Sequence, residues 1–307
     1  MKKILVVLIS IVIIPLGITN FFYEYKIKKI STGFITNKEK MKIRILKKDN
    51  TVENLDLEEY LIGVVSAEVP VSFEMEAIKA QAVAARTYAL KRIQNSKESN
   101  YDVTDDTSSQ VYQSDEQLKN KWKDKYEEYR NKIKEAVDKT NGEYLTYNDE
   151  IIYAFFFSTS NGKTENNKDV FGQDLPYLRV VDSSFDQSET SGFVVTKTFN
   201  LNEFCQKLGI SSNNIEIKDK VLTDSGRVKN ITINDKKFKG TEVRTKLSLR
   251  STDFTIQQNN NEIKITTKGF GHGVGMSQYG ANALAKQKKT YDEILKYYYQ
   301  GTNIKKL

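Results

Sequence analysis

The residue best suited to acid–base chemistry is Glu68, which lies just before Pro70 in the segment LEEYLIGVVSAEVP. Apolar residues recur through this segment at helical spacing, and Glu68 falls on the same face, one turn beyond Val64. A carboxylate on that face is desolvated, which raises its pKa and keeps it protonated, as a general acid requires. The alternative is a structural role, as a helix cap or in an ion pair with Arg86.

A glycine-rich segment, GFGHGVGMSQYG at residues 269–280, brings five glycines together with the only histidine of the chain. Glycines in this number suit a backbone that passes close to a ligand and then enters a helix. The setting is not that of a dinucleotide-binding loop, because no buried strand and acidic partner flank it. A tight, buried turn with His272 as a core residue is the alternative.

Two further clusters are rich in polar side chains. Residues 101–112, YDVTDDTSSQVY, carry Asp102, Asp105 and Asp106. They lack the D-x-D-x-D-G pattern of a calcium loop, so an aspartate-rich turn is the simpler interpretation. Residues 155–172, FFFSTSNGKTENNKDVFG, begin with an apolar run, and their polar part could hydrogen-bond a sugar or only turn the chain.

The composition limits the chemistry further. The chain has one cysteine and one histidine, which excludes an internal disulfide and a zinc site built from Cys and His alone. Its net charge is +7, yet residues 1–50 hold 11 of the 47 lysines and arginines and only three of the 40 acids. The rest of the chain is close to neutral, which disfavours nucleic acid as a partner. We expect catalysis by carboxylates, hydroxyls and amides, with no metal and no cofactor.

An apolar stretch, ILVVLISIVIIPLGITNFF, occupies residues 4–22. As a helix it spans about 28 Å at ~1.5 Å per residue, close to the thickness of the hydrocarbon core of a bilayer. We therefore expect one transmembrane helix at residues 4–22, a cytoplasmic tail at 1–3, a polar basic tether at 23–42 and an extracytoplasmic domain. A cleaved signal peptide is the alternative, but no A-x-A cleavage site follows the stretch.

Beyond this N-terminal transmembrane helix, periodicity predicts an α+β fold, with a mixed helical core and a strand-rich insertion. The predicted domain covers residues 43–302, and the insertion covers 193–267. The predicted elements are a hairpin turning at Asp49–Asn50, helices at 57–69, 73–95 (capped by Ser72) and 115–141, paired strands at 144–157 turning at Asn148–Asp149, turns at 234–235 and 259–261, short helices near 202–208 and 241–247, and a helix after the glycine-rich segment.

Several long blocks carry a resemblance to a known family. GVVSAEVPVSFEMEAIKAQAVAARTYAL, DVTDDTSSQVY, SNGKTENNKDVFG and GHGVGMSQYGANALA follow one another between about residues 43 and 300 and resemble the SpoIID/LytB family. The resemblance implies a lytic transglycosylase that cleaves the MurNAc–GlcNAc bond of peptidoglycan during engulfment of the forespore. Its substrate would be glycan strands whose stem peptides an amidase has removed. It would be a single-pass protein of the cell membrane facing the space between mother cell and forespore, with stage II sporulation proteins P and M as partners.

The resemblance also assigns residues. The family's catalytic acid lies in the A-E-x-P block, where this chain has Glu68. Arg86 in AARTY and Tyr279 in SQYG match positions that line the glycan cleft. To these we add, as substrate-binding residues, polar members of the glycine-rich segment and of residues 155–172, which are Gln278, His272, Ser277, Ser160 and Lys163.

Two comparisons within the family set the remaining expectations. Some relatives bind zinc through cysteine and histidine around the positions of Thr104, Ser108 and Ser109, and the loss of those ligands here predicts no zinc. The family also contains amidase enhancers, so a non-catalytic regulator or a wall-binding protein is the competing function. The retained A-E-x-P, AARTY and SQYG blocks favour the enzyme.

Overall fold

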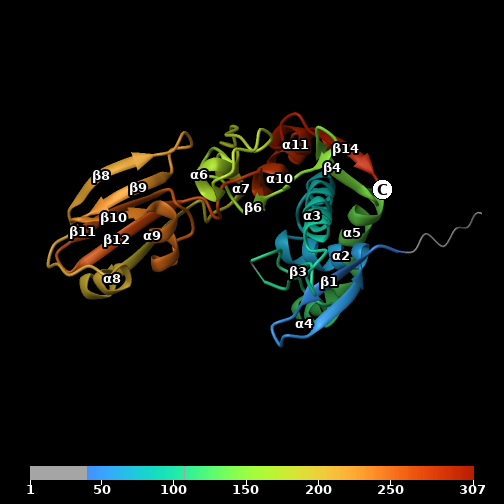
Figure 1. Cartoon of the computed structure of the whole chain (residues 1–307), viewed down its shortest axis with the longest axis horizontal. Coiled ribbons are helices and arrows are strands. Elements are labelled where there is room, and N and C mark those ends of the chain that lie inside the picture. Colours follow the sequence, from blue (N-terminus) through green and yellow to red (C-terminus); the bar gives the residue numbers. More distant parts are fainter. Residues whose placement is uncertain (1–39, 107) are drawn as a thin grey trace, which may run out of the picture. The chain divides into compact units, whose positions relative to one another are not determined.

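A hairpin and a helix place Glu68. The computed structural model describes residues 40–106 and 108–307, of which Lys42–Leu307 form one unit (Figure 1). Strands β1 (Lys42–Leu46) and β2 (Val52–Asp56) pair antiparallel, as predicted, and Asn50 in their turn has a positive φ of 65°. Helix α2 (Leu57–Glu68) follows, and the Asp56 carboxylate caps it by accepting from the first-turn amides. The helix ends at Glu68, two residues before Pro70.

The alanine-rich helix α3 (Met75–Asn95) is the centre of the helical part, where it packs against α2, α5, α10, α11 and β4 (Figure 1). The predicted start of this helix, at Phe73 with Ser72 as the cap, was wrong. The N-cap position is Glu74, whose backbone N–H donates to Asn282 Oδ1 at 2.9 Å. A tertiary contact therefore replaces the local cap that the sequence suggested.

The helix predicted at 115–141 is interrupted. It divides into α4 (Asp115–Trp122), a 3₁₀ turn, η1 (Lys123–Lys125), and α5 (Tyr126–Lys139). Lys123 adopts a φ of 49°, which an uninterrupted right-handed helix does not allow. A capping box between Ser114 and Gln117 starts α4. The interruption places Trp122 at the end of one helix, close to the start of the next.

Short strands connect distant parts of the chain. Strand β4 (Glu143–Tyr147) pairs with β5 (Glu150–Ile151), as predicted, and with the C-terminal β14 (Asn303–Lys306), which was not predicted. Strand β6 (Phe156–Phe157) does not extend that hairpin, because it pairs in parallel with β13 (Met276–Ser277). Likewise, β3 (Val103–Thr104) pairs in parallel with β1. These parallel pairs bring segments that are far apart in the sequence next to one another.

The strand-rich segment forms as predicted, including its turns and its two short helices. One sheet has the order β11-β12-β7 and another the order β10-β9-β8. Their elements are β7 (Val194–Asn200), α8 (Leu201–Leu208), β8 (Ile217–Leu222), β9 (Val228–Ile233), β10 (Lys236–Lys239), α9 (Gly240–Leu247), β11 (Phe254–Asn259) and β12 (Glu262–Lys268). A hydrophobic cluster around Phe204 and Phe254 is their own core.

Four further helices complete the mixed fold, and the predicted α+β class is confirmed for the described residues. They are α6 (Asn167–Phe171), α7 (Asp186–Glu189), α10 (Gln278–Lys286) and α11 (Tyr291–Tyr298). The expected transmembrane helix at 4–22, and all but the last residues of the tether at 23–42, lie outside the described residues. Within the described part, no helix combines the length and the apolar character that a membrane span needs.

The glycine-rich loop offers a matched test of packing. Gly275 and Gly226 both have positive φ, 78° and 82°, but an added Cβ would lie 2.0 Å from the Phe155 carbonyl oxygen at Gly275 and meet no atom within 4 Å at Gly226. We expect Gly226→Ala to cost about 1 kcal/mol of backbone strain and Gly275→Ala about 3 kcal/mol or more, because β6 must move. Urea unfolding of both variants measures the difference. Equal losses of stability in the two variants would show that backbone strain, and not the close contact with Phe155, sets the cost of an added Cβ.

Candidate active site

Glu68 is held by two donors from distant parts of the chain. Its Oε1 accepts from the Val111 backbone N–H at 3.0 Å, and its Oε2 accepts from Gln278 Nε2 at 3.3 Å. Val111 belongs to the aspartate-rich block, and Gln278 is the first residue of α10, after the glycine-rich loop. Three of the blocks singled out in the sequence therefore meet at one half-buried carboxylate.

The surroundings of Glu68 favour its neutral form. Burial raises the pKa of Glu68, and the hydrogen bonds from Val111 and Gln278 only partly oppose that rise. The residue also ends α2, where the negative end of the helix dipole disfavours an anion. No salt bridge to Glu68 occurs within residues 40–106 and 108–307. The suggested ion pair with Arg86 is not formed, so the carboxyl keeps the raised pKa that proton donation requires.

Arg86 instead joins two helices inside the core. Its side chain is fully buried, and its Nε donates to Glu58 Oε1 at 2.8 Å. Further bonds reach the carbonyl oxygens of Val137 and Glu143 and the hydroxyl of Thr140. A contact between Arg86 and a glycan would require some of these bonds to open.

Gln278 and Tyr279 contact Glu68 and the loop that follows it. Gln278 bonds the carboxylate itself, whereas the half-buried ring of Tyr279 packs edge-on against Phe73, at 5.1 Å between ring centroids. Phe73 lies in the loop that follows Glu68. The backbone N–H of Tyr279 donates to the Ser158 carbonyl oxygen, which fixes the start of α10. Of the predicted substrate-binding residues, Gln278 is the one that bonds Glu68.

Ser277 and Ser160 meet at a buried carboxylate that sequence reasoning missed. Asp186 is fully buried and accepts from the Ser160 backbone N–H at 2.6 Å, from Ser183 Oγ at 2.6 Å and from Ser277 Oγ. Burial raises the pKa of Asp186, and these hydrogen bonds oppose the rise. Both predicted serines are buried, and through Asp186 they join the glycine-rich segment and residues 155–172 to the start of α7. Asp186 follows no periodic pattern in the sequence, so nothing there pointed to it.

His272 lies among aromatic rings. Its imidazole is 5.6 Å from the Phe157 ring and 5.3 Å from the Phe171 ring, between centroids, and its Nδ1 accepts from the Val274 backbone N–H. Burial lowers the pKa of His272 to about 4, with the charge of Arg244 adding to the effect. The side chain is therefore neutral at neutral pH. These contacts, with the close packing of Gly275, fit the tight-turn interpretation of the glycine-rich segment.

Lys163 is exposed, and the contacts of its segment are structural. Its backbone forms a bridge with Asp182. Two residues further on, buried Glu165 accepts from the hydroxyls of Thr223 and Ser225, both at 2.6 Å. Ser225 also accepts from buried Arg227 at 2.8 Å. This network, which sequence reasoning did not foresee, attaches residues 155–172 to the strand-rich segment.

The aspartates of residues 101–112 have local partners. Asp102 is buried and pairs with Arg44 at 2.7 Å, and Asp106 accepts from the Ser108 backbone N–H, as in an aspartate-rich turn. The Thr104 hydroxyl lies 2.8 Å from that of Ser108 and 3.1 Å from that of Ser109. The described residues include no group of three or more histidine, cysteine, aspartate or glutamate side chains placed to hold a metal ion.

Comparisons with known proteins identify relatives of this chain. The family model described as Stage II sporulation protein matches residues 46–147, which include Glu68 and Val111. Stage II sporulation protein D of Bacillus subtilis (strain 168) is 47% identical over 262 residues, which cover 83% of this chain and 76% of that protein. The chain belongs to the stage II sporulation protein D family.

Two other relatives show how sequence identity differs between members of this family and a protein of another name. Stage II sporulation protein D of Bacillus amyloliquefaciens is 46% identical over 262 residues, or 83% of this chain and 76% of that protein. A protein of Bacillus subtilis (strain 168) named Amidase enhancer is 28% identical over 302 residues, or 80% of this chain and 40% of that protein. Similarity to stage II sporulation protein D is thus much higher than similarity to the amidase enhancer.

Glu68→Gln should stabilise the protein, increasingly as pH rises. The pKa of Glu68 in the folded protein lies above the ordinary value of 4.5. The contribution of Glu68 to stability is therefore complete below pH 4.5 and is lost as the pH rises through the pKa of the folded protein. A neutral glutamine keeps the Val111 bond and does not ionise. Urea unfolding from pH 4 to pH 8 should therefore show a growing advantage of the variant. For Glu59→Gln, at an exposed residue of the same helix, the difference from wild type in the free energy of unfolding should change little with pH. If the difference for Glu68→Gln is equally independent of pH, the pKa of Glu68 is not raised.

Glu58→Gln should destabilise the protein far more than Glu59→Gln. Glu58 is the counter-ion of fully buried Arg86, whereas Glu59 pairs with Arg130 and is 51% exposed. Removing one partner of a buried pair leaves an uncompensated charge and costs about 3 kcal/mol, while an exposed pair contributes about 0.5 kcal/mol or less. Thermal and urea unfolding measure both losses. If the two neighbours lose equal stability, Arg86 does not depend on Glu58.

Proposed function

We propose that this protein is a membrane-anchored lytic transglycosylase. It would cleave the MurNAc–GlcNAc bonds of peptide-stripped peptidoglycan strands and leave 1,6-anhydro ends. The observation that supports this most directly is Glu68, a half-buried carboxylate with a raised pKa and no salt bridge among the described residues. Half-burial suits a general acid, because the group is desolvated enough to hold a proton and open enough to meet a substrate.

One carboxylate is sufficient for this reaction. Hydrolytic glycosidases generally use two carboxylates, because an enzymic base or nucleophile must act beside the acid. The influences on the pKa of Glu68 are burial and two neutral donors, with no second acid among them. In a lytic transglycosylase, the 6-hydroxyl of the sugar itself takes the place of water.

The proposed steps conserve atoms and protons. Protonated Glu68 gives its proton to the glycosidic oxygen, and the bond from that oxygen to the anomeric carbon breaks with its electrons on the leaving oxygen. The 6-hydroxyl oxygen then bonds the anomeric carbon, and its proton goes to the Glu68 carboxylate, which regenerates the acid. We assign the mobile proton to Oε2, because its bond to Gln278, at 3.3 Å, is longer than the bond between Oε1 and Val111.

The cellular setting is part of the proposal. The apolar stretch at 4–22 would anchor the protein in the cell membrane, with residues 43–302 in the space between mother cell and forespore. Similarity to relatives named stage II sporulation protein D supports action in sporulation, at engulfment, with stage II sporulation proteins P and M as partners. Substrate contacts from Tyr279, His272 and Lys163 also belong to this proposal. Arg86, Ser277 and Ser160 are fully buried and would contact a glycan only if their internal hydrogen bonds opened.

A regulator of an amidase is the second candidate. The 28% identity to a protein named Amidase enhancer is the observation that favours it. A regulator would bind the wall or the amidase and would not need a protonated carboxyl. Its stimulation of an amidase would therefore persist after Glu68 is replaced.

Product analysis separates the two functions. Full-length wild type, incubated with peptide-free glycan strands, should release fragments with 1,6-anhydro ends by mass spectrometry, and Glu68→Gln should reduce that release by about 10²–10⁴-fold. Glu59→Gln, at an exposed residue of the same helix, should keep the activity. Ordinary reducing ends would disprove the transglycosylase mechanism, and full activity of Glu68→Gln would remove this residue from it. Unchanged stimulation of an amidase by Glu68→Gln, without new ends, would identify a regulator.

A further inference from the structure

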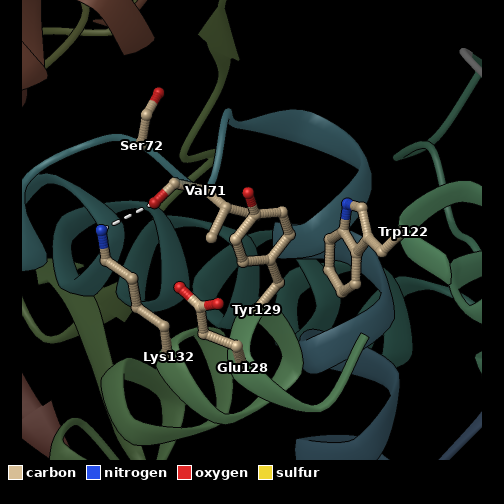
Figure 2. A pocket seen from close by; sticks show the side chains of 6 residues that line it. All are labelled: Val71, Ser72, Trp122, Glu128, Tyr129 and Lys132. Carbon is tan, nitrogen blue, oxygen red and sulfur yellow. Dashed lines mark hydrogen bonds between the residues drawn. The ribbon is translucent and has the colours of Figure 1, made fainter. Parts of the chain in front are cut away.

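The only tryptophan of the chain, Trp122, lines an open pocket and is only partly buried. The pocket has a volume of about 410 Å³, within the usual range for a ligand site. It lies between the loop after Glu68 and the helices α4 and α5 (Figure 2). Its lining residues are Val71, Ser72, Trp122, Glu128, Tyr129 and Lys132.

The two rings in this pocket form a corner. Trp122 and Tyr129 are 5.7 Å apart between centroids, with an angle of 87° between their planes. Figure 2 shows Tyr129 between Trp122 and the polar side chains of Glu128 and Lys132. A sugar ring presents apolar C–H faces and polar hydroxyls around its edge. Aromatic rings that combine apolar faces with a polar tip, next to a carboxylate and a serine hydroxyl, match that chemistry.

Two lysines attach the pocket to the chain on either side of Glu68. Lys121 Nζ donates to the Ser66 carbonyl oxygen at 3.3 Å, two residues before Glu68. Lys132 Nζ donates to the carbonyl oxygens of Val71 and Phe73 at 2.7 and 2.8 Å, in the loop after it. Because three peptide units join Glu68 to Val71, their Cα atoms are at most about 11 Å apart. The pocket is therefore within a few sugar rings of the acid.

We propose that this pocket is a saccharide-binding subsite, in which the rings of Trp122 and Tyr129 hold a sugar of the glycan strand away from the bond that is cleaved. The inference rests on the proposed function, because it takes the glycan as the ligand. Ser72 and Glu128, both exposed, would hydrogen-bond the hydroxyls of that sugar. The subsite would bind the glycan equally strongly in the ground state and in the transition state. It should therefore lower KM for long strands and leave kcat unchanged.

The single tryptophan makes the subsite observable without catalysis. The full-length Glu68→Gln protein, which does not consume its ligand, is titrated in detergent with peptide-free glycan strands while its tryptophan fluorescence is recorded. We expect a saturable change with a defined Kd. Adding Tyr129→Ala should weaken binding by about tenfold and adding Glu128→Gln by severalfold, whereas Glu127→Gln, exposed on the same helix but outside the pocket, should have no effect.

Kinetics give a second readout that does not depend on fluorescence. In otherwise wild-type protein, Tyr129→Ala should raise KM for long strands by about tenfold with kcat unchanged. The same variant should leave kcat/KM unchanged for the shortest fragments that are still cleaved, because those do not reach the subsite. Thermal unfolding of each variant excludes a general loss of folding.

The outcomes separate this inference from the proposed function. The first outcome is that wild type cleaves strands and that Glu68→Gln binds them in sedimentation, but the tryptophan fluorescence of Glu68→Gln does not change. This outcome would overturn the subsite and leave the transglycosylase intact. A response to glycan that Tyr129→Ala weakens, without any cleavage by wild type, would support the subsite and overturn the enzyme. A response to free stem peptides instead of glycan would overturn the subsite, since the pocket would then be a peptide site.

Discussion

The candidate site depends on keeping a carboxyl group at the end of a helix with no salt bridge from any described residue. Glu68 is desolvated and lies at the negative end of the α2 dipole, and both effects oppose its charge. The surroundings offset this cost with two neutral donors, the Val111 amide and Gln278, which do not force ionisation as an arginine would. Arg86, the cation that the sequence offered as a partner, is bound to Glu58 on the first turn of the same helix. That separation of charges leaves burial as the dominant effect on Glu68, and its pKa is raised.

Where local pattern determines structure, the sequence was sufficient. The hairpin at residues 42–56, helix α2 and the alternating strands of residues 193–267 follow from periodicity and turn residues alone. The errors occur where a contact from elsewhere in the chain or an unusual backbone conformation decides. Asn282 replaces Ser72 as the cap at the start of α3. The positive φ of Lys123 interrupts a helix that the sequence predicted to be continuous. Strand β14 has no pattern of its own, since it exists only by pairing with β4.

The site was predictable to a similar extent. The carboxyl group at its centre, Glu68, could be singled out because an ionisable residue on an apolar helix face is exceptional, and Gln278 because its block resembles a family motif. Buried polar groups such as Asp186 could not be found, because serine and aspartate in a turn look the same whether they face solvent or each other. Their role depends on long-range partners such as Ser160 and Ser277. Polar residues near a motif therefore include both ligand-binding groups and groups that hold the motif in place.

The contacts that restrain the chain around Glu68 also explain why a pocket occurs beside it. Lys121 of α4 bonds the Ser66 carbonyl oxygen in the last turn of α2, and Lys132 of α5 bonds two carbonyl oxygens of the loop that follows Glu68. Because both lysines bond backbone carbonyls, they restrain the chain around Glu68 without occupying its side chains. The helices that carry these lysines also carry Trp122 and Tyr129. The same hydrogen bonds that restrain the chain around Glu68 therefore fix the distance between Glu68 and the two rings. A glycan strand bound at both places would be held near Glu68 by rigid elements, so the subsite would favour binding of long strands without changing the chemical step.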